Sequence, residues 1–137
     1  MIPERYAPQT YALFRIVFGL LFFFYGLQKT MGWFGGQAQP LMSLQGAAGS
    51  IETLCGFLIM IGLFTRPAAF IASGEMAVAF FMVHVGIIAA GKQLGFPLNF
   101  VPHMQGGIDA VAFCFAFLYI ASRGAGIWSA DAAMGKK

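Results

Sequence analysis

The sequence predicts an all-α integral membrane protein, a four-helix bundle with both termini in the cytoplasm. Only 9% of the 137 residues are charged, whereas roughly 25% are charged in soluble domains. Hydrophobic residues make up 59%, more than a water-soluble fold of this size covers with so few charges. The bilayer is therefore the predicted solvent, and four apolar stretches approach the roughly 20 residues that a helix needs to span it.

We predict membrane spans at residues 11–29, 47–64, 67–90 and 104–122, which make residues 1–137 one transmembrane domain. The second stretch is the shortest and has the required length only if it begins near Ala47. Pro67 separates the second span from the third, because proline cannot continue the preceding helix but is tolerated in the first turn of the next. Residues 47–90 are therefore predicted to form a helical hairpin.

The distribution of Lys and Arg predicts the orientation, because short loops that carry them stay on the cytoplasmic side. Five of these residues lie at the two ends of the chain and in the turn before the third span: Arg5, Arg66, Arg123, Lys136 and Lys137. Only Lys29 and Lys92 belong to the opposite side. Both termini are predicted to be cytoplasmic, in a bacterial cytoplasmic (inner) membrane. The outer loops, residues 30–49 and 91–103, are candidates for a lid.

Several function classes lack the residues that they require. The eight Lys and Arg are mostly scattered singly, so nucleic acid is not a predicted partner. Cys55 and Cys114 lie in separate apolar stretches without C-x-x-C spacing, which gives no support for a disulfide framework or a metal site. A bis-His haem would need His84 and His103 to approach each other across the outer face. The chain has no evident metal or flavin site of its own, and the lipid bilayer is its predicted partner.

Two ionisable residues are predicted to form a structural ion pair inside the bundle. Arg15 shares a helix face with Gly19, Phe22, Gly26 and Lys29, and Glu75 shares one with small residues of the third span. Stripes of small residues let membrane helices approach closely, so both charges are predicted to point inward. Counting helical rise from the cytoplasmic side places Arg15 about one turn deep and Glu75 about two. In the alternative interpretation, the pair has no other role than to fix the register of the two helices.

The other ionisable groups gather toward the outer side, where they are candidates for one polar pocket. Glu52, His84 and Asp109 are the candidate catalytic residues, and the candidates for cofactor binding are Lys29, Glu52, His84, His103 and Asp109. The alternatives are structural. Glu52 and Asp109 begin helices, whose first turns stabilise carboxylates; Lys29 extends to the interface; and His84 is a packing residue. The aromatic runs 22–25 and 80–81 are candidates for stacking on a quinone, or they fill the bundle.

The order of these motifs resembles the DoxX family of small four-helix membrane proteins. Arg15 to Gly19 and Gly26 to Lys29 are similar to its R-x-x-x-G and G-x-x-K motifs, and Glu52 to Gly56 to its E-x-x-x-G motif. Residues 62–69 are similar to its G-L-x-T-R-x-A-A segment, and residues 124–131 to its G-x-G-x-x-S-x-D ending. At residues 105–109 the family more often has Asn-Gly-Gly and a glutamate.

The resemblance implies a membrane protein of quinone-linked oxidation, a process in which some members are subunits of thiosulfate:quinone oxidoreductases. It implies a quinone as cofactor and other membrane or redox subunits as partners. Two alternatives remain open: a non-catalytic structural subunit packed against a larger membrane complex, and a binder of a small apolar ligand.

Overall fold

The computed structural model describes residues 2–33, 35, 38, 42–81 and 108–135. All regular structure among these residues is helical. A short 3-10 helix, Glu4–Tyr6, leads into α1, Ala7–Thr30, and is followed by α2, Leu44–Ile61, and α3, Thr65–Ala79. The last two helices are α5, Ile108–Arg123, and α6, Ala130–Ala133. The all-α prediction is confirmed for the described residues.

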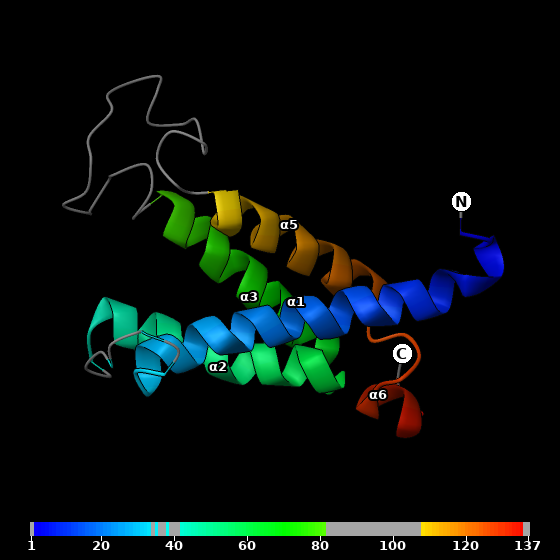
Figure 1. The fold of residues 1–137 in the computed structure, drawn as a ribbon, viewed down its shortest axis with the longest axis horizontal. Helices are drawn as coiled ribbons and strands as arrows, with labels where there is room; N and C mark the ends of the chain where they lie inside the picture. The colour runs from blue at the N-terminus through cyan, green and yellow to red at the C-terminus, as the bar shows by residue number, and fades with distance from the viewer. Residues whose placement is uncertain (1, 34, 36–37, 39–41, 82–107, 136–137) are drawn as a thin grey trace, which may run out of the picture.

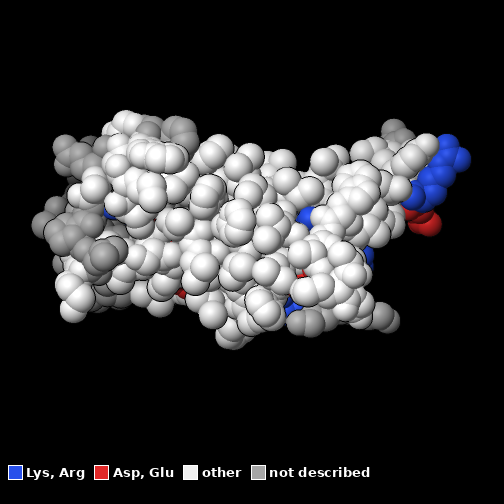
Figure 2. All heavy atoms as spheres, turned by 90° about the horizontal axis from the view of Figure 1, so that it is seen from below, with Lys and Arg blue, Asp and Glu red and all other residues white. Residues whose placement is uncertain are grey.

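The long helices pack in two antiparallel pairs. α1 lies beside α2, and α3 lies beside α5, with α2 also contacting α3 (Figure 1). The N-terminus and α6 lie at the same end of this arrangement (Figure 1). Figure 2 shows that most of the surface in that view carries no charge, and that most of the charged atoms lie toward the end that holds the N-terminus. This distribution suits a bundle whose middle faces lipid.

α1 is long enough to cross a bilayer. Together with the preceding 3-10 turn it forms a 27-residue apolar segment, Glu4–Thr30, which is the one helix among the described residues to meet both the length and the composition of a membrane span. α2 contains a shorter apolar segment, Gly46–Ile61. The predicted spans at 67–90 and 104–122 are described only in part, because residues 82–107 lie outside the described structure.

The first two helices begin earlier than predicted. α1 starts at Ala7 with Pro8 in its first turn, where proline costs no hydrogen bond. α2 starts at Leu44 because the Ser43 hydroxyl accepts a hydrogen bond from Gly46 N, 3.0 Å away, and caps the helix. The predicted outer loop 30–49 therefore ends before Leu44, and the second helix has 18 residues.

The break between α2 and α3 lies close to the predicted position. α2 ends at Ile61 rather than at Phe64, because Gly62 adopts a left-handed conformation with φ of 75°, a common way to terminate a helix. Phe64 is also left-handed, with φ of 48°, and α3 begins at the next residue, with Pro67 in its first turn. The prediction of a hairpin turn with proline in the following helix is confirmed.

The core lies where the aromatic side chains of α1 and α5 meet the small side chains of α3. Phe22 and Phe117 are fully buried, with ring centroids 4.7 Å apart, and Phe113 packs 5.5 Å from Phe22. Ala69 and Ala72 of α3 are also fully buried, and their small size lets α5 approach closely. Phe22 is thus a packing residue in this structure.

The C-terminal segment folds back and caps α3. Asp131 is buried, and its two carboxylate oxygens accept hydrogen bonds from Phe64 N at 2.9 Å and Thr65 N at 3.0 Å. Its own amide donates to Gly62 O at 2.8 Å. The N-cap residue of α3 provides no side-chain cap itself, so a carboxylate 66 residues away along the chain satisfies the free amides of this helix.

We expect Asp131→Ala to lower the free energy of unfolding by about 0.5 to 2 kcal/mol, the range for loss of a helix cap. Asp131→Asn keeps one acceptor oxygen and is expected to lose less. Thermal unfolding of the protein in detergent, followed by circular dichroism, measures both changes. An Asp131→Ala protein that melts together with the wild type would show that the cap does not stabilise α3.

Candidate functional site

A partly buried ion pair joins the end of α1 to α2. Lys29 Nζ lies 2.7 Å from Glu52 Oε1, and the Glu52 side chain is 1% exposed, against 29% for Lys29. Glu52 is the ninth residue of α2, beyond the first turn in which free amides stabilise a carboxylate. The structure therefore gives Glu52 a specific partner, and Lys29 directs its ammonium to that partner rather than to the interface alone.

Two glycines make this pairing possible. A Cβ on Gly26 would overlap the backbone of Thr53, and a Cβ on Gly49 would lie 2.6 Å from Lys29 Cβ. Real Cβ atoms do not approach other atoms that closely, so α1 and α2 reach this separation only with glycine at both positions. The predicted G-x-x-K motif thus combines a close helix contact at Gly26 with a cation one turn later.

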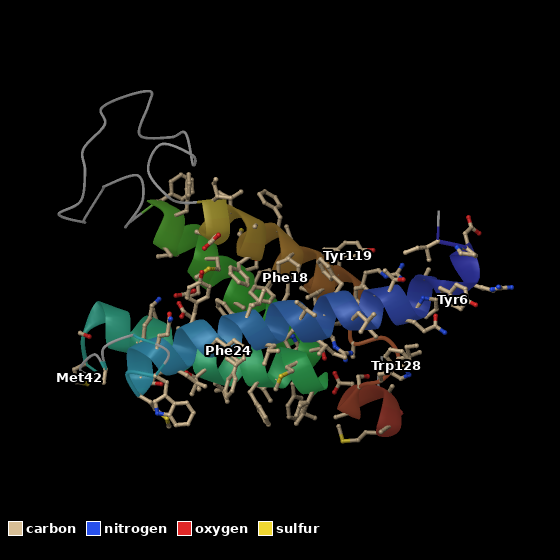
Figure 3. The ribbon with its side chains drawn as sticks, in the orientation of Figure 1. Tyr6, Phe18, Phe24, Met42, Tyr119 and Trp128 are labelled. Carbon is tan, nitrogen blue, oxygen red and sulfur yellow. The ribbon has the colours of Figure 1, made fainter. Side chains whose placement is uncertain are left out.

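Glu75 of α3 lies next to this pair. Its carboxyl group interacts with that of Glu52 and with the charge of Lys29. Glu52 Oε2 and Glu75 Oε2 are both buried, and neither accepts a hydrogen bond from a donor group of the described residues; the two carboxyl groups lie close enough to share a proton in a hydrogen bond with each other. Side-chain oxygen and nitrogen atoms gather where α1, α2 and α3 approach each other, at the end away from the termini (Figure 3). We call Lys29, Glu52 and Glu75 the polar cluster.

A second polar contact links α1 to α5 at the same end. The Tyr25 hydroxyl donates a hydrogen bond to Asp109 Oδ2 at 2.8 Å, and Tyr25 also interacts with the charge of Glu52. Asp109 is in the first turn of α5 and is exposed, as expected for a carboxylate at a helix start. Tyr25 thus binds Asp109 and is close enough to Glu52 to be affected by its charge. The sequence predicted Tyr25 as part of an aromatic run, not as a hydrogen-bond donor.

The predicted pocket is described only in part. Glu52, Lys29 and Asp109 lie toward one end of the bundle. That this end is the outer side and that these residues share one pocket stay predictions. His84 and His103 lie outside the described residues, so their place in the pocket stays a prediction.

The predicted ion pair between Arg15 and Glu75 is wrong. Arg15 is fully buried, and its guanidinium donates to the backbone carbonyls of Ala125 at 2.5 Å, Trp128 at 2.8 Å and Ile127 at 3.4 Å. Glu75 instead interacts with the carboxyl group of Glu52.

The error arises from the relative height of the helices. Arg15 lies at the height of the turn between α2 and α3, where α3 begins. A Cβ on Gly62 in this turn would be 3.0 Å from Arg15 Nη1. Glu75 is ten residues beyond Thr65, the first residue of α3, which is about 15 Å at helical rise. The inward orientation predicted for Arg15 and Phe22 is confirmed, because both are fully buried.

The segment after α5 is held by hydrogen bonds from side chains to its backbone carbonyls. The sequence did not predict these contacts. Besides Arg15, Tyr11 donates its hydroxyl to Gly124 O at 2.5 Å. Arg66 donates to the carbonyls that end α5, those of Ala121, Ser122 and Arg123. The R-x-x-x-G, T-R and G-x-G-x-x-S-x-D motifs therefore meet at one end of the bundle, where they fix the chain after α5.

Comparison with known proteins places the chain in a family. The sequence profile of the DoxX family matches residues 10–85. An uncharacterized protein of Haemophilus influenzae is 37% identical over 142 residues, a match that covers 98% of this chain and 97% of the relative. No solved structure is significantly similar. The matched family segment contains the ion pair of α1 with α2 and all of α3, and the chain belongs to the DoxX family of membrane proteins.

Proposed function

We propose that this protein is the membrane subunit of a quinone-linked redox system, and that the polar cluster binds the quinone head group and exchanges its protons. The observation that carries the proposal is the ion pair of Lys29 with the buried Glu52, with Glu75 beside it. Ionisable side chains inside a membrane are costly and usually serve function. We further propose a four-helix bundle with both termini cytoplasmic in the bacterial inner membrane.

The residues of the cluster fit a quinone head group. The Lys29 ammonium is a donor suited to a carbonyl oxygen. The buried Oε2 atoms of Glu52 and Glu75 accept no hydrogen bond from a donor group of the described residues, so these carboxyl groups can accept or donate a proton. Two carboxyl groups facing one ammonium are electrically balanced when they hold one proton between them, and an apolar environment favours that balance. The cluster therefore has a proton to exchange without creating an isolated charge.

A quinone, when bound, accepts two electrons and two protons. In this proposal a partner redox subunit delivers the electrons, and the protons pass through the carboxyl groups of Glu52 and Glu75. Glu52 takes no part in helix capping, and its burial keeps bulk water from competing for the exchanged proton. Tyr25 is affected by the charge of Glu52 and donates a hydrogen bond to Asp109 in the exposed first turn of α5, and this pair offers a route for protons from water.

We expect Lys29→Met and Glu52→Gln to reduce the quinone that copurifies with the protein by about tenfold or more, because hydrogen bonds to charged groups contribute about 1.5 to 3 kcal/mol. Mild detergent extraction followed by mass spectrometry of lipophilic cofactors and bound proteins measures the loss. Glu4→Gln is the matched control, since Glu4 is an exposed carboxylate at the opposite end.

Two outcomes would contradict the proposal. If Glu52→Gln retains as much quinone as Glu4→Gln, the cluster does not bind the head group. If the wild type copurifies in a stoichiometric protein complex without quinone, the protein is a structural subunit. A bound apolar molecule of another class would instead identify a small-ligand binder.

A further inference from the structure

A second candidate site lies at the opposite end of the bundle, where both termini are. A cavity of about 340 Å³ opens there between the start of α1, the end of α5 and the segment that follows it. Its lining combines one cation with mostly apolar or small groups: Pro8, Tyr11, Ser122, Arg123, Gly126 and Ile127. None of these residues belongs to the polar cluster.

The cation of this cavity is available for a ligand. Arg15 and Arg66 at the same end are engaged by backbone carbonyls. The Arg123 guanidinium instead lies over the Tyr11 ring, 5.4 Å from its centroid, and forms no hydrogen bond or ion pair with the described residues. An exposed guanidinium stacked on a tyrosine is pre-oriented for an anion.

The charge of this end also favours an anion. Its exposed ionisable side chains in the described structure are the cations Arg5, Arg66 and Arg123 and the anion Glu4. Asp131 is buried, and its carboxylate is bound to the amides of α3. The end is therefore positive by two charges, and Figure 2 shows basic atoms gathered there.

The surroundings of the cavity are apolar. Tyr11 of the lining packs on Tyr119 of α5 at 5.9 Å, and Phe14 packs on Tyr119 at 6.1 Å. These contacts form a seam between α1 and α5, and Figure 3 shows Tyr119 on α5 beside α1. Leu118 and Tyr119 on this part of α5 are exposed, as are Leu13 and Val17 on α1. A ligand that fits both the cavity with its arginine and the apolar seam beside it has an anionic head and an apolar tail.

We propose that this cavity binds the phosphate of an anionic phospholipid, with Arg123 as its charged partner and the acyl chains along the seam between α1 and α5. The site is independent of the quinone proposal, because it shares no residue with the polar cluster and lies at the other end of the molecule. A lipid bound here contacts α1, α5 and the C-terminal segment together.

The test compares two arginines that differ in one respect. Arg5 and Arg123 are both exposed at this end and both lie over a tyrosine ring, but Arg5 does not line the cavity. The full chain, Arg123→Gln, Arg123→Lys and Arg5→Gln are placed in nanodiscs of mixed phosphatidylcholine and phosphatidylglycerol. Native mass spectrometry then counts the lipids of each kind that stay bound when the protein is released from the nanodisc.

We expect the wild type to retain phosphatidylglycerol over phosphatidylcholine, and Arg123→Gln to weaken this preference about fivefold, which corresponds to about 1 kcal/mol for one basic residue at an anionic surface. Arg5→Gln should retain the preference, and Arg123→Lys most of it. Equal losses for Arg5→Gln and Arg123→Gln, or no preference in the wild type, would overturn the proposal. Displacement of the lipid by inorganic phosphate alone would show a site for free phosphate and would overturn it too.

Discussion

Arg15→Ala is expected to destabilise the protein by about 2 to 6 kcal/mol, because two carbonyl groups lose their donor. The guanidinium is fully buried and donates to the carbonyls of Ala125 and Trp128 at 2.5 and 2.8 Å. A buried polar group left without its partner costs about 1 to 3 kcal/mol, and two carbonyls lose their donor here. The segment after α5 would then be held mainly by Tyr11 and Asp131.

Unfolding in mixed micelles with increasing denaturing detergent measures this loss as a change in the free energy of unfolding. Arg5→Ala is the control, because Arg5 is exposed and binds no carbonyl in the described structure. Arg15→Lys should fall in between, since an ammonium cannot reproduce the planar fork that reaches two carbonyls at once. Equal stabilities of Arg15→Ala and Arg5→Ala would mean that the contacts of Arg15 with the C-terminal segment do not stabilise the fold.

The sequence predicted the orientation of Arg15 but not its partner, for a physical reason. Residues seven apart share a helix face, so periodicity alone places Arg15, Phe22 and Lys29 on the buried side, as observed for Arg15 and Phe22. The partner depends on how far one helix is shifted along another, which is a tertiary property. Backbone carbonyls of residues 125–128 carry no side-chain signal in the sequence, so nothing in the composition of that segment marks them as acceptors.

The position of Glu75 could have been predicted from the hairpin. Glu52 lies nine residues before Ile61, the last residue of α2, and Glu75 lies ten residues after Thr65, the first residue of α3. Antiparallel helices joined by a short turn bring such residues to the same height. Counting from this turn, rather than from an assumed membrane surface, places Glu75 beside Glu52. The location of His84 and His103 stays a prediction, because the described residues do not include them.

Gly26→Ala is expected to lower the free energy of unfolding by about 1 to 3 kcal/mol, the usual cost of overpacking. The double variant Gly19→Ala with Gly26→Ala is expected to lower it by more. A Cβ on Gly19 would lie 2.6 Å from Met60 N, and one on Gly26 would overlap the Thr53 backbone. Backbone atoms cannot move aside as flexible side chains do, so α1 and α2 must separate. Gly26 lies one turn before Lys29, and the separation should also weaken the ion pair of Lys29 with Glu52.

Gly74→Ala is the matched control for these changes. Gly74 lies inside α3, and a Cβ there would meet no atom of the described residues within 4 Å. Alanine favours a helix over glycine by about 1 kcal/mol, so this variant should be as stable as the wild type or slightly more stable. Thermal unfolding of the three variants in one detergent separates the close approach of α1 and α2 from a general intolerance of alanine. Equal melting temperatures for Gly26→Ala and Gly74→Ala would contradict this prediction. They would mean that α1 and α2 accommodate a Cβ at Gly26, and that the ion pair of Lys29 with Glu52 does not require glycine there.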